Sequence, residues 1–211
     1  MANALPATPI RGTDLNPQDW LEAGQSLLRR GGLRALKLRP LAAELRVTTG
    51  SFYHHFADFD AYQGQLADYF AGAHITNVLD AIQRAEREPI ARIRLLAEIV
   101  RRRGLSRLSI AMRAWAESDP RAQAAVERND AQVLDFLGDC LRANGFAPYQ
   151  ARVRSYALMT LGLSKVHAPD LDRPALMEEM IALLCTLTPK TAVSAVQEER
   201  AWQAKASTIS S

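Results

Sequence analysis

The sequence has few groups that could cross-link the chain or hold it in a membrane. Two of its 211 residues are cysteines, Cys140 and Cys185, and two cysteines this far apart are too few for a disulfide framework. The first fifteen residues lack the cationic start and apolar block of a secretory signal. No apolar run approaches the roughly 18 residues that span a membrane. These absences predict a protein of the reducing cytoplasm with no membrane partner.

Patterns typical of enzymes are also missing. The chain has no glycine-rich phosphate loop, no Ser-His-Asp arrangement that we can justify and no paired carboxylates in an apolar cleft. Both cysteines lie in apolar stretches, which favours packing over redox sensing, because sensing needs an exposed thiolate in an electropositive setting. No two histidines have a metal-ligand spacing on one clear face; the four are His54, His55, His74 and His167. We therefore expect no enzyme activity, no metal and no cofactor.

Strand signals are absent as well, since no segment alternates apolar and polar residues between turn pairs. Apolar residues instead recur at helical spacing, and prolines stand where first helical turns would begin. Asn16 and Asp119 precede two of these prolines as candidate caps. The pattern predicts an all-α fold, with helices over 17–30, 38–45, 59–85, 89–103, 106–117, 120–144, 148–165 and 174–187, and a further seven-residue helix that ends near Phe56.

The segment 38–56 has the pattern of a helix-turn-helix. Its first helix carries one apolar stripe at i, i+3, i+4 and i+7, made of Leu38, Leu41, Ala42 and Leu45. Thr48 is predicted to cap the second helix through its hydroxyl, with Phe52 and Phe56 pointing inward. The outward face then carries no carboxylate and consists of Thr49, Gly50, Ser51, Tyr53 and His54. Such a face suits phosphates and base edges, which predicts a helix that lies in the major groove of DNA.

The charge around this segment is strongly positive. The whole chain carries a formal charge of only +3, but between residues 28 and 57 the single acid Glu44 stands against six bases. These are Arg29, Arg30, Arg34, Lys37, Arg39 and Arg46. Six bases minus one acid leave a local excess of +5, the electrostatic footprint of a DNA-facing module. An ordinary solvated charge run is the alternative interpretation.

The segment Val47-Thr-Thr-Gly-Ser-Phe-Tyr-His-His-Phe56 resembles the recognition helix of the tetracycline-repressor (TetR) family of bacterial transcription regulators. Leu41-Ala-Ala-Glu-Leu45 is similar to that family's second helix, and 111–120 resembles a segment common in the ligand-binding domain of one large subgroup. The strong resemblance covers about residues 16–70. The chain departs from the family pattern at Arg46, where glycine is usual, at Lys37, where Ser or Thr is usual, and at 57–60, where Ala-Asp-Phe-Asp replaces Ser-Lys-Glu.

The helix-turn-helix and the resemblance together predict a double-stranded, palindromic DNA operator as partner. Gly50 is expected to allow close approach to the DNA backbone, since glycine inside a helix costs about 1 kcal/mol relative to alanine. A weak helix start is the alternative explanation for this glycine. The predicted DNA-binding residues are Lys37, Arg39, Arg46, Thr48, Thr49, Gly50, Ser51, Tyr53 and His54.

The last two predicted helices indicate dimerisation. Apolar residues cover most of the circumference of 156–163, and a broad apolar stripe runs along 176–187, so each helix needs cover on more than one side. A two-fold partner would supply it in a four-helix packing, although both could be core helices of a monomer. The predicted homodimer interface consists of Tyr156, Met159, Gly162, Leu163, Met180 and Leu184.

The resemblance also implies a domain plan and a mechanism. We expect a DNA-binding domain over 1–60 with its core at 16–57, an effector-binding and dimerisation domain over 61–190, and a mobile tail over 191–211. A small-molecule effector would enter a pocket near Phe70, His74, Met112 and Trp115, and the helix 59–85 would swing to release a repressor from its operator. Two rivals remain open: a regulator of the same fold without an effector, and a helical enzyme or lipid carrier.

Overall fold

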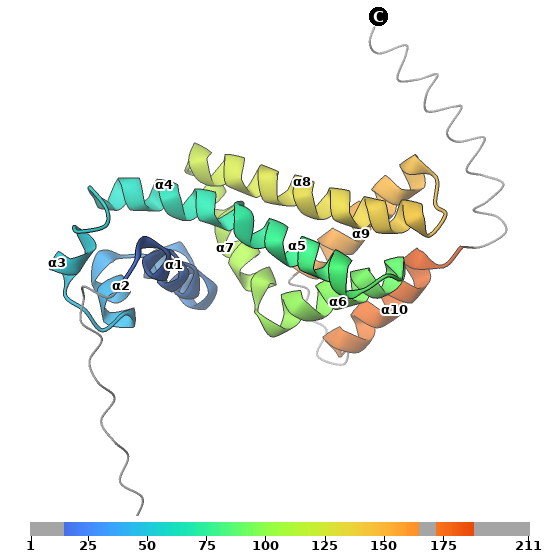
Figure 1. The fold of residues 1–211 in the computed structure, drawn as a ribbon, viewed down its shortest axis with the longest axis horizontal. Coiled ribbons are helices and arrows are strands. Elements are labelled where there is room, and N and C mark those ends of the chain that lie inside the picture. The colour runs from blue at the N-terminus through green and yellow to red at the C-terminus, as the bar shows by residue number, and fades with distance from the viewer. Residues whose placement is uncertain (1–14, 165–171, 188–211) are drawn as a thin grey trace, which may run out of the picture. The chain divides into compact units, whose positions relative to one another are not determined.

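The computed structural model describes residues 15–164 and 172–187, without the side chains of residues 73 and 74. Its regular structure is helical throughout these ranges, and no strand occurs in them, which confirms the predicted all-α class. The helices are α1 (Pro17–Gly31), the short 3-10 helix η2 (Leu33–Ala35), α2 (Leu38–Glu44), α3 (Thr49–Phe52), α4 (Phe59–Phe70), α5 (Ala73–Ala85), α6 (Pro89–Arg102), α7 (Leu105–Ala116), α8 (Pro120–Ala143), α9 (Pro148–Leu163) and α10 (Arg173–Cys185) (Figure 1).

The chain forms two compact units. The first unit contains the chain up to Gly72 together with Arg107–Glu127, and the second contains Ala73–Ser106 and the chain from Arg128 onward. The long helix α8 therefore begins in the first unit and ends in the second. The first unit is larger than the predicted DNA-binding domain because α4 and 107–127 pack with α1–α3. A functional boundary at residue 60 stays a prediction, and the tail over 191–211 lies outside the described residues.

One expected helix is interrupted. The prediction of a continuous helix over 59–85 was wrong, because α4 ends at Phe70 and α5 begins at Ala73. Ala71 has left the helical conformation, with φ −99° and ψ 5°, and Gly72 follows it. Glycine is a poor helix former, and this glycine stands where the first unit gives way to the second. The other long helices begin and end within two residues of the predicted positions.

The core of the first unit gathers around α1 and α4. Asn16 caps α1 as predicted: its Oδ1 accepts from the N–H groups of Gln18 and Asp19, at 2.8 and 3.2 Å, and the Asp19 carboxylate accepts from the Asn16 N–H. The hydroxyl of Tyr62 on α4 donates to the carbonyl of Trp20 at 2.9 Å. A Cβ on Gly24 would lie 2.0 Å from that hydroxyl, so the crossing of α1 and α4 requires glycine there.

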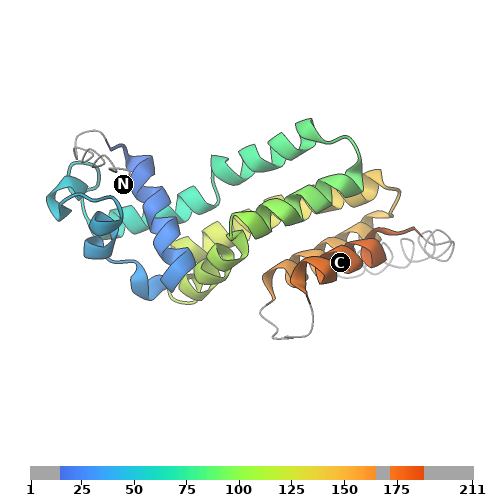
Figure 2. The ribbon, with the colours of Figure 1, turned by 90° about the horizontal axis from the view of Figure 1, so that it is seen from below.

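The second unit packs α5, α6, the later part of α8, α9 and α10 around its own apolar cluster. Figure 2 shows α9 and α10 side by side. The guanidinium of Arg154 on α9 lies 4.4 Å from the ring centre of Phe146 and donates to the carbonyl of Leu184 on α10. Cys140 and Cys185 are buried in this cluster as free thiols, as their apolar surroundings in the sequence predict. Burial raises the pKa of the Cys140 thiol to about 11.

Among the described residues, no helix is both long enough and apolar enough to cross a lipid bilayer.

Candidate nucleic-acid interface

The helix-turn-helix is formed by α2, the turn 45–48 and α3. The α-helix of α3 is shorter than the seven residues predicted, because after Phe52 the backbone tightens into i→i+3 bonds. The N–H of His54 donates to the carbonyl of Ser51 at 3.3 Å, and that of His55 donates to Phe52 at 3.0 Å. Residues 53–56 therefore continue α3 as a hydrogen-bonded turn. We call α3 and this turn, residues 49–56, the recognition segment.

The start of α3 differs from the expectation. Thr48 is its N-cap residue, with extended backbone angles of φ −80° and ψ 156°, but its side chain makes no capping hydrogen bond. The N–H of Ser51 donates instead to the Thr48 carbonyl at 3.1 Å. The predicted hydroxyl cap was therefore wrong, because a backbone acceptor takes the place of the side chain, and the Thr48 side chain stays exposed at the surface.

Aromatic rings fix the recognition segment to the unit beneath it. Phe52 and Phe56 are buried, as predicted, and their rings stack at 5.0 Å between centroids. Phe52 also meets Trp20 of α1 and Tyr62 of α4 edge to face, each at 5.4 Å. Phe52 thus fills the space between three helices, and this platform decides which side of the segment faces outward.

The outward side carries Thr48, Thr49, Gly50, Tyr53 and His54, all exposed. Ser51 is the exception: only 8% of its surface is accessible, so its expected place on the outer face was wrong. Ser51 directly precedes Phe52, and the turn of the short helix carries both residues toward the core. The remaining exposed groups are hydroxylic, aromatic or imidazole, and none is acidic. This composition fits contacts with phosphates and base edges.

Cationic side chains flank this surface. Lys37 and Arg39 at the start of α2 and Arg46 in the turn are all exposed. Glu44, the one acid between residues 28 and 57, pairs with Arg30 of α1 and accepts from the Ser26 hydroxyl at 3.3 Å. The hydrogen bond from Arg30 lowers the pKa of the Glu44 carboxyl. Because Arg30 neutralises Glu44, the positive field toward solvent comes undiminished from Lys37, Arg39 and Arg46. The sequence pattern did not reveal the pairing of Arg30 with Glu44.

Arg46 occupies a conformation that favours glycine. It has φ 57°, the only positive φ of a non-glycine residue in the described part of the chain. The N–H of Arg46 donates to Ala43 at 3.2 Å and that of Val47 to Ala42 at 3.0 Å, which is the hydrogen-bond pattern of a Schellman helix end. A left-handed conformation costs a residue with a Cβ about 1–2 kcal/mol. The turn therefore contains backbone strain at Arg46, a residue whose side chain ends in a guanidinium group.

The other predicted site residues lie away from this surface. Phe70, Met112 and Trp115 are buried in the apolar cluster of the first unit, and the Trp115 indole donates to Asp119 Oδ2 at 3.2 Å. The side chain of His74 lies outside the described residues, and so does His167. An effector pocket at Phe70, His74, Met112 and Trp115 stays a prediction.

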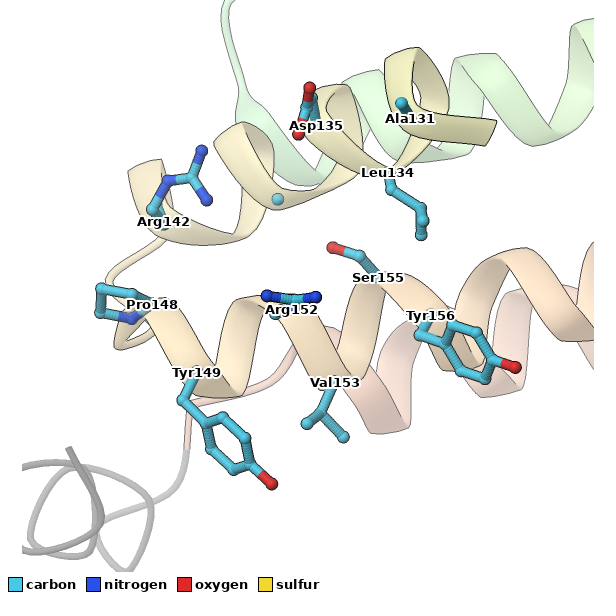
Figure 3. A pocket seen from close by; sticks show the side chains of 11 residues that line it. Ala131, Leu134, Asp135, Arg142, Pro148, Tyr149, Arg152, Val153, Ser155 and Tyr156 are labelled. Atoms are coloured by element: carbon cyan, nitrogen blue, oxygen red, sulfur yellow. The ribbon is translucent and has the colours of Figure 1, made fainter. Parts of the chain in front are cut away.

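A groove that the sequence did not indicate opens between α8 and α9 (Figure 3). Its volume is about 850 Å³. The side chains of Leu134 on α8 and Ser155 on α9 point toward each other there (Figure 3). Gly138 lines it as well, and a Cβ there would sit 3.1 Å from Arg142 Nη1 and 3.7 Å from the hydroxyl of Ser155. The lining residues are Ala131, Leu134, Asp135, Gly138, Arg142, Pro148, Tyr149, Arg152, Val153, Ser155 and Tyr156.

The predicted dimer-interface residues divide into two groups. Tyr156 is 68% exposed, and Gly162, Leu163 and Met180 are half-buried. Met159 and Leu184 pack against the apolar cluster of the second unit.

Comparison with known proteins adds a sequence match and a fold match. A family model described as "Bacterial regulatory proteins, tetR family" matches residues 21–58, the part of the chain from α1 to the turn before α4. No curated protein matches the chain.

Solved structures resemble the chain over most of its length. A TetR transcriptional regulator from Legionella pneumophila has 14% identity and a TM-score of 0.67, with 81% of this chain and 96% of that chain covered. AibR, solved with isovaleryl coenzyme A and operator DNA, has 19% identity and a TM-score of 0.58, with 81% and 99% covered. FadR from Bacillus subtilis, solved with stearoyl-CoA, has 15% identity and a TM-score of 0.57, with 80% and 97% covered. At these identities the likeness shows a shared fold.

Proposed function

We propose that this chain is a DNA-binding transcription regulator of the tetR family of bacterial regulatory proteins, whose family model matches residues 21–58. We further propose that it is a repressor, which a small molecule releases from a palindromic operator. The observation that carries the proposal is the recognition segment: an exposed face without acids, seated on buried Phe52 and Phe56 and flanked by exposed cations. The protein acts in the cytoplasm, where the DNA is.

The exposed residues divide naturally into two kinds of contact. Tyr53 and His54 project from the middle of the recognition segment and are the candidates for base edges. Lys37, Arg39 and Arg46 stand at its margins and are the candidates for phosphates, which fix the register of the protein on the duplex.

Gly50 supports the same orientation. A Cβ built on this residue would meet only the Thr48 hydroxyl, at an ordinary contact distance of 3.6 Å. Its φ is not positive either, so neither packing nor backbone conformation within the protein requires glycine there. A helical glycine that the protein itself does not need is explained by close approach of an outside molecule, and here that molecule is the DNA backbone.

The binding experiment starts from a duplex that the full-length protein enriches from a random pool. Tyr53→Ala and His54→Ala should each weaken binding of that duplex in gel shifts at matched salt. His54 is exposed, so the melting temperature of His54→Ala should stay unchanged, whereas Tyr53→Ala also loses an edge contact with the Phe52 ring at 5.4 Å and should melt slightly lower. Gln65→Ala, exposed on α4, is the control that should bind as the unmodified protein does. Full affinity in both recognition-segment variants would overturn the proposed reading surface.

Dimerisation is supported by apolar residues on the outer faces of α9 and α10. On α9 they are Tyr149, Val153, Tyr156 and Leu163, with the small polar Thr160 completing the spacing of four and three. On α10 the same spacing gives Leu176, Met180, Leu183 and Leu187. The opposite faces of both helices are already buried by the unit's own core, at Leu158 and Ile181 for example. Two such seams per protomer fit a four-helix packing of two copies.

This arrangement refines the predicted interface. Tyr156, Leu163 and Met180 belong to the seams, whereas Met159 and Leu184 serve the protomer's own core. Gly162 has open space beside it, since a Cβ there would meet nothing within 4 Å. Tyr149, Val153 and Tyr156 also line the groove between α8 and α9, so the partner copy would cover part of that groove.

Release by an effector follows from the need for two recognition segments to enter the DNA at once. Successive major grooves lie about 34–36 Å apart, so a modest change in the separation of the segments weakens binding. The lever would be α4 alone, since the break at 71–72 separates it from α5. Coupling of this kind is typically worth about 1–3 kcal/mol.

The effector experiment uses the ligands found with AibR and FadR as probes, isovaleryl coenzyme A and stearoyl-CoA. A ligand-dependent rise in melting temperature together with loss of the gel-shift complex would support an effector-controlled repressor. A Trp115→Phe variant tests whether the effector lies beside the predicted pocket. If neither a panel of acyl-CoA thioesters nor other small molecules changes melting or operator binding, the regulator of the same fold without an effector becomes the better proposal.

A further inference from the structure

Arg121, at the start of α8, joins two carboxylates that lie far apart in the sequence. Its Nη1 donates to Asp60 Oδ2 at 3.0 Å and its Nη2 to Asp60 Oδ1 at 2.8 Å, a two-pronged pair. On the other side, its Nε donates to Asp119 Oδ1 at 3.1 Å and its Nη2 to Asp119 Oδ2 at 2.9 Å. All three nitrogens of the guanidinium are therefore used, and the planar group is held in one orientation.

The Asp119 end of this network is anchored. The Asp119 side chain is only 14% exposed, and its Oδ2 also accepts from the indole N–H of Trp115, which is buried. Asp119 Oδ1 accepts from the backbone N–H of Arg121 at 2.9 Å, so this carboxylate caps α8 as well. Hydrogen bonds from Arg121 hold the pKa of Asp119 below its usual value. The hydrogen bonds at the corner between α7 and α8 thus hold the Arg121 side chain in place.

The Asp60 end of this network is connected to the recognition segment through the neighbours of Asp60 on α4. Asp60 belongs to the first turn of α4, and its backbone carbonyl also accepts from Arg121 Nη1, at 3.2 Å. The residue before it, Phe59, and the residue two positions after it, Tyr62, both contact the ring of Phe52 in α3, at 6.1 and 5.4 Å between centroids. Any shift of the first turn of α4 therefore moves the two rings that hold Phe52.

We propose that Arg121 is a positioning residue for DNA binding, which fixes the first turn of α4, and through it the recognition segment, to the α7–α8 corner. The inference rests on the proposed reading of DNA by the recognition segment. It concerns residues outside the matched part 21–58, apart from their contacts with it, and it makes Asp60 a structural partner of the recognition segment rather than a chance acid beside a DNA-binding surface.

The charge of these residues gives the test a clear sign. Asp60 is an acid, so simple electrostatics predicts that Asp60→Asn should strengthen binding to the DNA polyanion. The positioning role predicts the opposite, a weaker complex. Arg121→Gln should weaken operator binding by roughly three- to tenfold, in line with an exposed but two-pronged ion pair. The double variant Asp60→Asn/Arg121→Gln should lose no more than either single variant, because both break the same link.

Arg142→Gln is the matched control. Arg142 stands on the same helix, its side chain is 46% exposed against 41% for Arg121, and within the described ranges its ion pair is with the neighbouring acid Asp139. Both substitutions remove one positive charge from α8. Operator affinity by fluorescence anisotropy and melting temperature are measured for all variants, with Arg121→Lys included to ask how far a cation without the planar fork restores binding.

The proposal is supported if Arg121→Gln and Asp60→Asn both weaken operator binding while they remain folded at the assay temperature, and if Arg142→Gln does not. It is overturned if Asp60→Asn binds as tightly as the unmodified protein or more tightly, or if Arg142→Gln loses as much as Arg121→Gln. Failure of the unmodified protein to enrich any duplex would instead refute the proposed function, so the two failures are distinguishable.

Discussion

Phe52 and Tyr62 meet edge to face, with ring centroids 5.4 Å apart and ring planes at 68°. The hydroxyl of the same tyrosine donates to the Trp20 carbonyl. One aromatic side chain on α4 therefore touches the recognition segment with its ring and α1 with its hydroxyl. The same few contacts of Tyr62 therefore stabilise the first unit and orient its proposed DNA-facing surface.

Removal of the Phe52 ring should be severe. Phe52→Ala deletes a buried ring that contacts Trp20, Phe56 and Tyr62, and we expect a loss of about 3–5 kcal/mol in the free energy of unfolding. Urea unfolding followed by circular dichroism measures it. Phe52→Leu, which keeps an apolar side chain, should lose clearly less. Equal losses in the two variants would mean that apolar volume alone contributes little here and that the ring contacts account for the whole effect.

Two helical glycines should respond to alanine in opposite ways. Gly50→Ala should raise the free energy of unfolding by up to about 1 kcal/mol, because the Cβ has room and alanine is the better helix former. The same variant should bind the operator more weakly, since the Cβ points toward the DNA backbone. Gly24→Ala should instead destabilise the protein by about 1–3 kcal/mol, because its Cβ would overlap the Tyr62 hydroxyl. Tighter operator binding by Gly50→Ala would contradict the assignment.

Arg46 should show a trade of stability against binding. Arg46→Gly removes the strain of a positive φ and should stabilise the fold by roughly 1–2 kcal/mol. If Arg46 contacts a phosphate, Arg46→Gly and Arg46→Ala should both reduce the slope of log affinity against log salt by about 0.9. Arg46→Ala keeps the strain, so only the glycine variant should gain stability. An unchanged slope would show that the guanidinium does not reach the DNA.

The oligomeric state should depend on the outer seam of α10. Leu183 is 67% exposed, so Leu183→Arg should leave the protomer folded but place an unpaired charge in the proposed interface. Sedimentation velocity should then report monomers that bind a palindromic operator more weakly. Ala182→Arg, exposed on the same helix but outside the seam, should remain dimeric. Dimers of Leu183→Arg would direct attention to a different surface.

The thiol of Cys140 should be unreactive in the folded protein. Burial raises its pKa to about 11 from an ordinary value of 9.0, so little thiolate forms at neutral pH. Iodoacetamide at pH 8 should alkylate unfolded protein rapidly and native protein slowly, as read by mass spectrometry. Between pH 9 and 11 the folded state holds a proton that the unfolded state has lost, so this thiol lowers stability as pH rises through that range. Rapid labelling of native protein would reopen a redox role.

Much of the fold was predictable because its signals are local. The spacing of Phe52 and Phe56 identified the buried side of the recognition segment, and Asn16 before Pro17 identified the start of α1. Such features depend on neighbours within a few residues, which the sequence displays directly. The break at Gly72 was missed, because apolar spacing continues on both sides of it and only packing into two units shows where the helix ends.

The site was less predictable wherever partners are distant in sequence. The pairing of Arg30 with Glu44 and of Arg121 with Asp60 depends on how α1, α2, α4 and α8 pack, which no periodicity encodes. The burial of Ser51 depends on how the short α3 is seated on α1 and α4. The positive φ of Arg46, by contrast, had a signal: the family usually has glycine at this turn, and a helix end of this type favours glycine.

The surroundings of Trp20 have a practical consequence. Its indole ring lies 5.4 Å from Phe52 and 6.2 Å from His55, and its nitrogen is buried without a hydrogen-bond partner among the described residues. Indole emission shifts to longer wavelength when water reaches the ring. Loosening of the recognition segment should therefore shift the fluorescence emission maximum of Trp20 to longer wavelength. Trp115 is bonded to Asp119 at the far end of the Arg121 network. With Trp202 replaced by phenylalanine, Trp20 and Trp115 are the two remaining tryptophan fluorophores. They lie at the two ends of the contacts that connect Arg121 with the recognition segment.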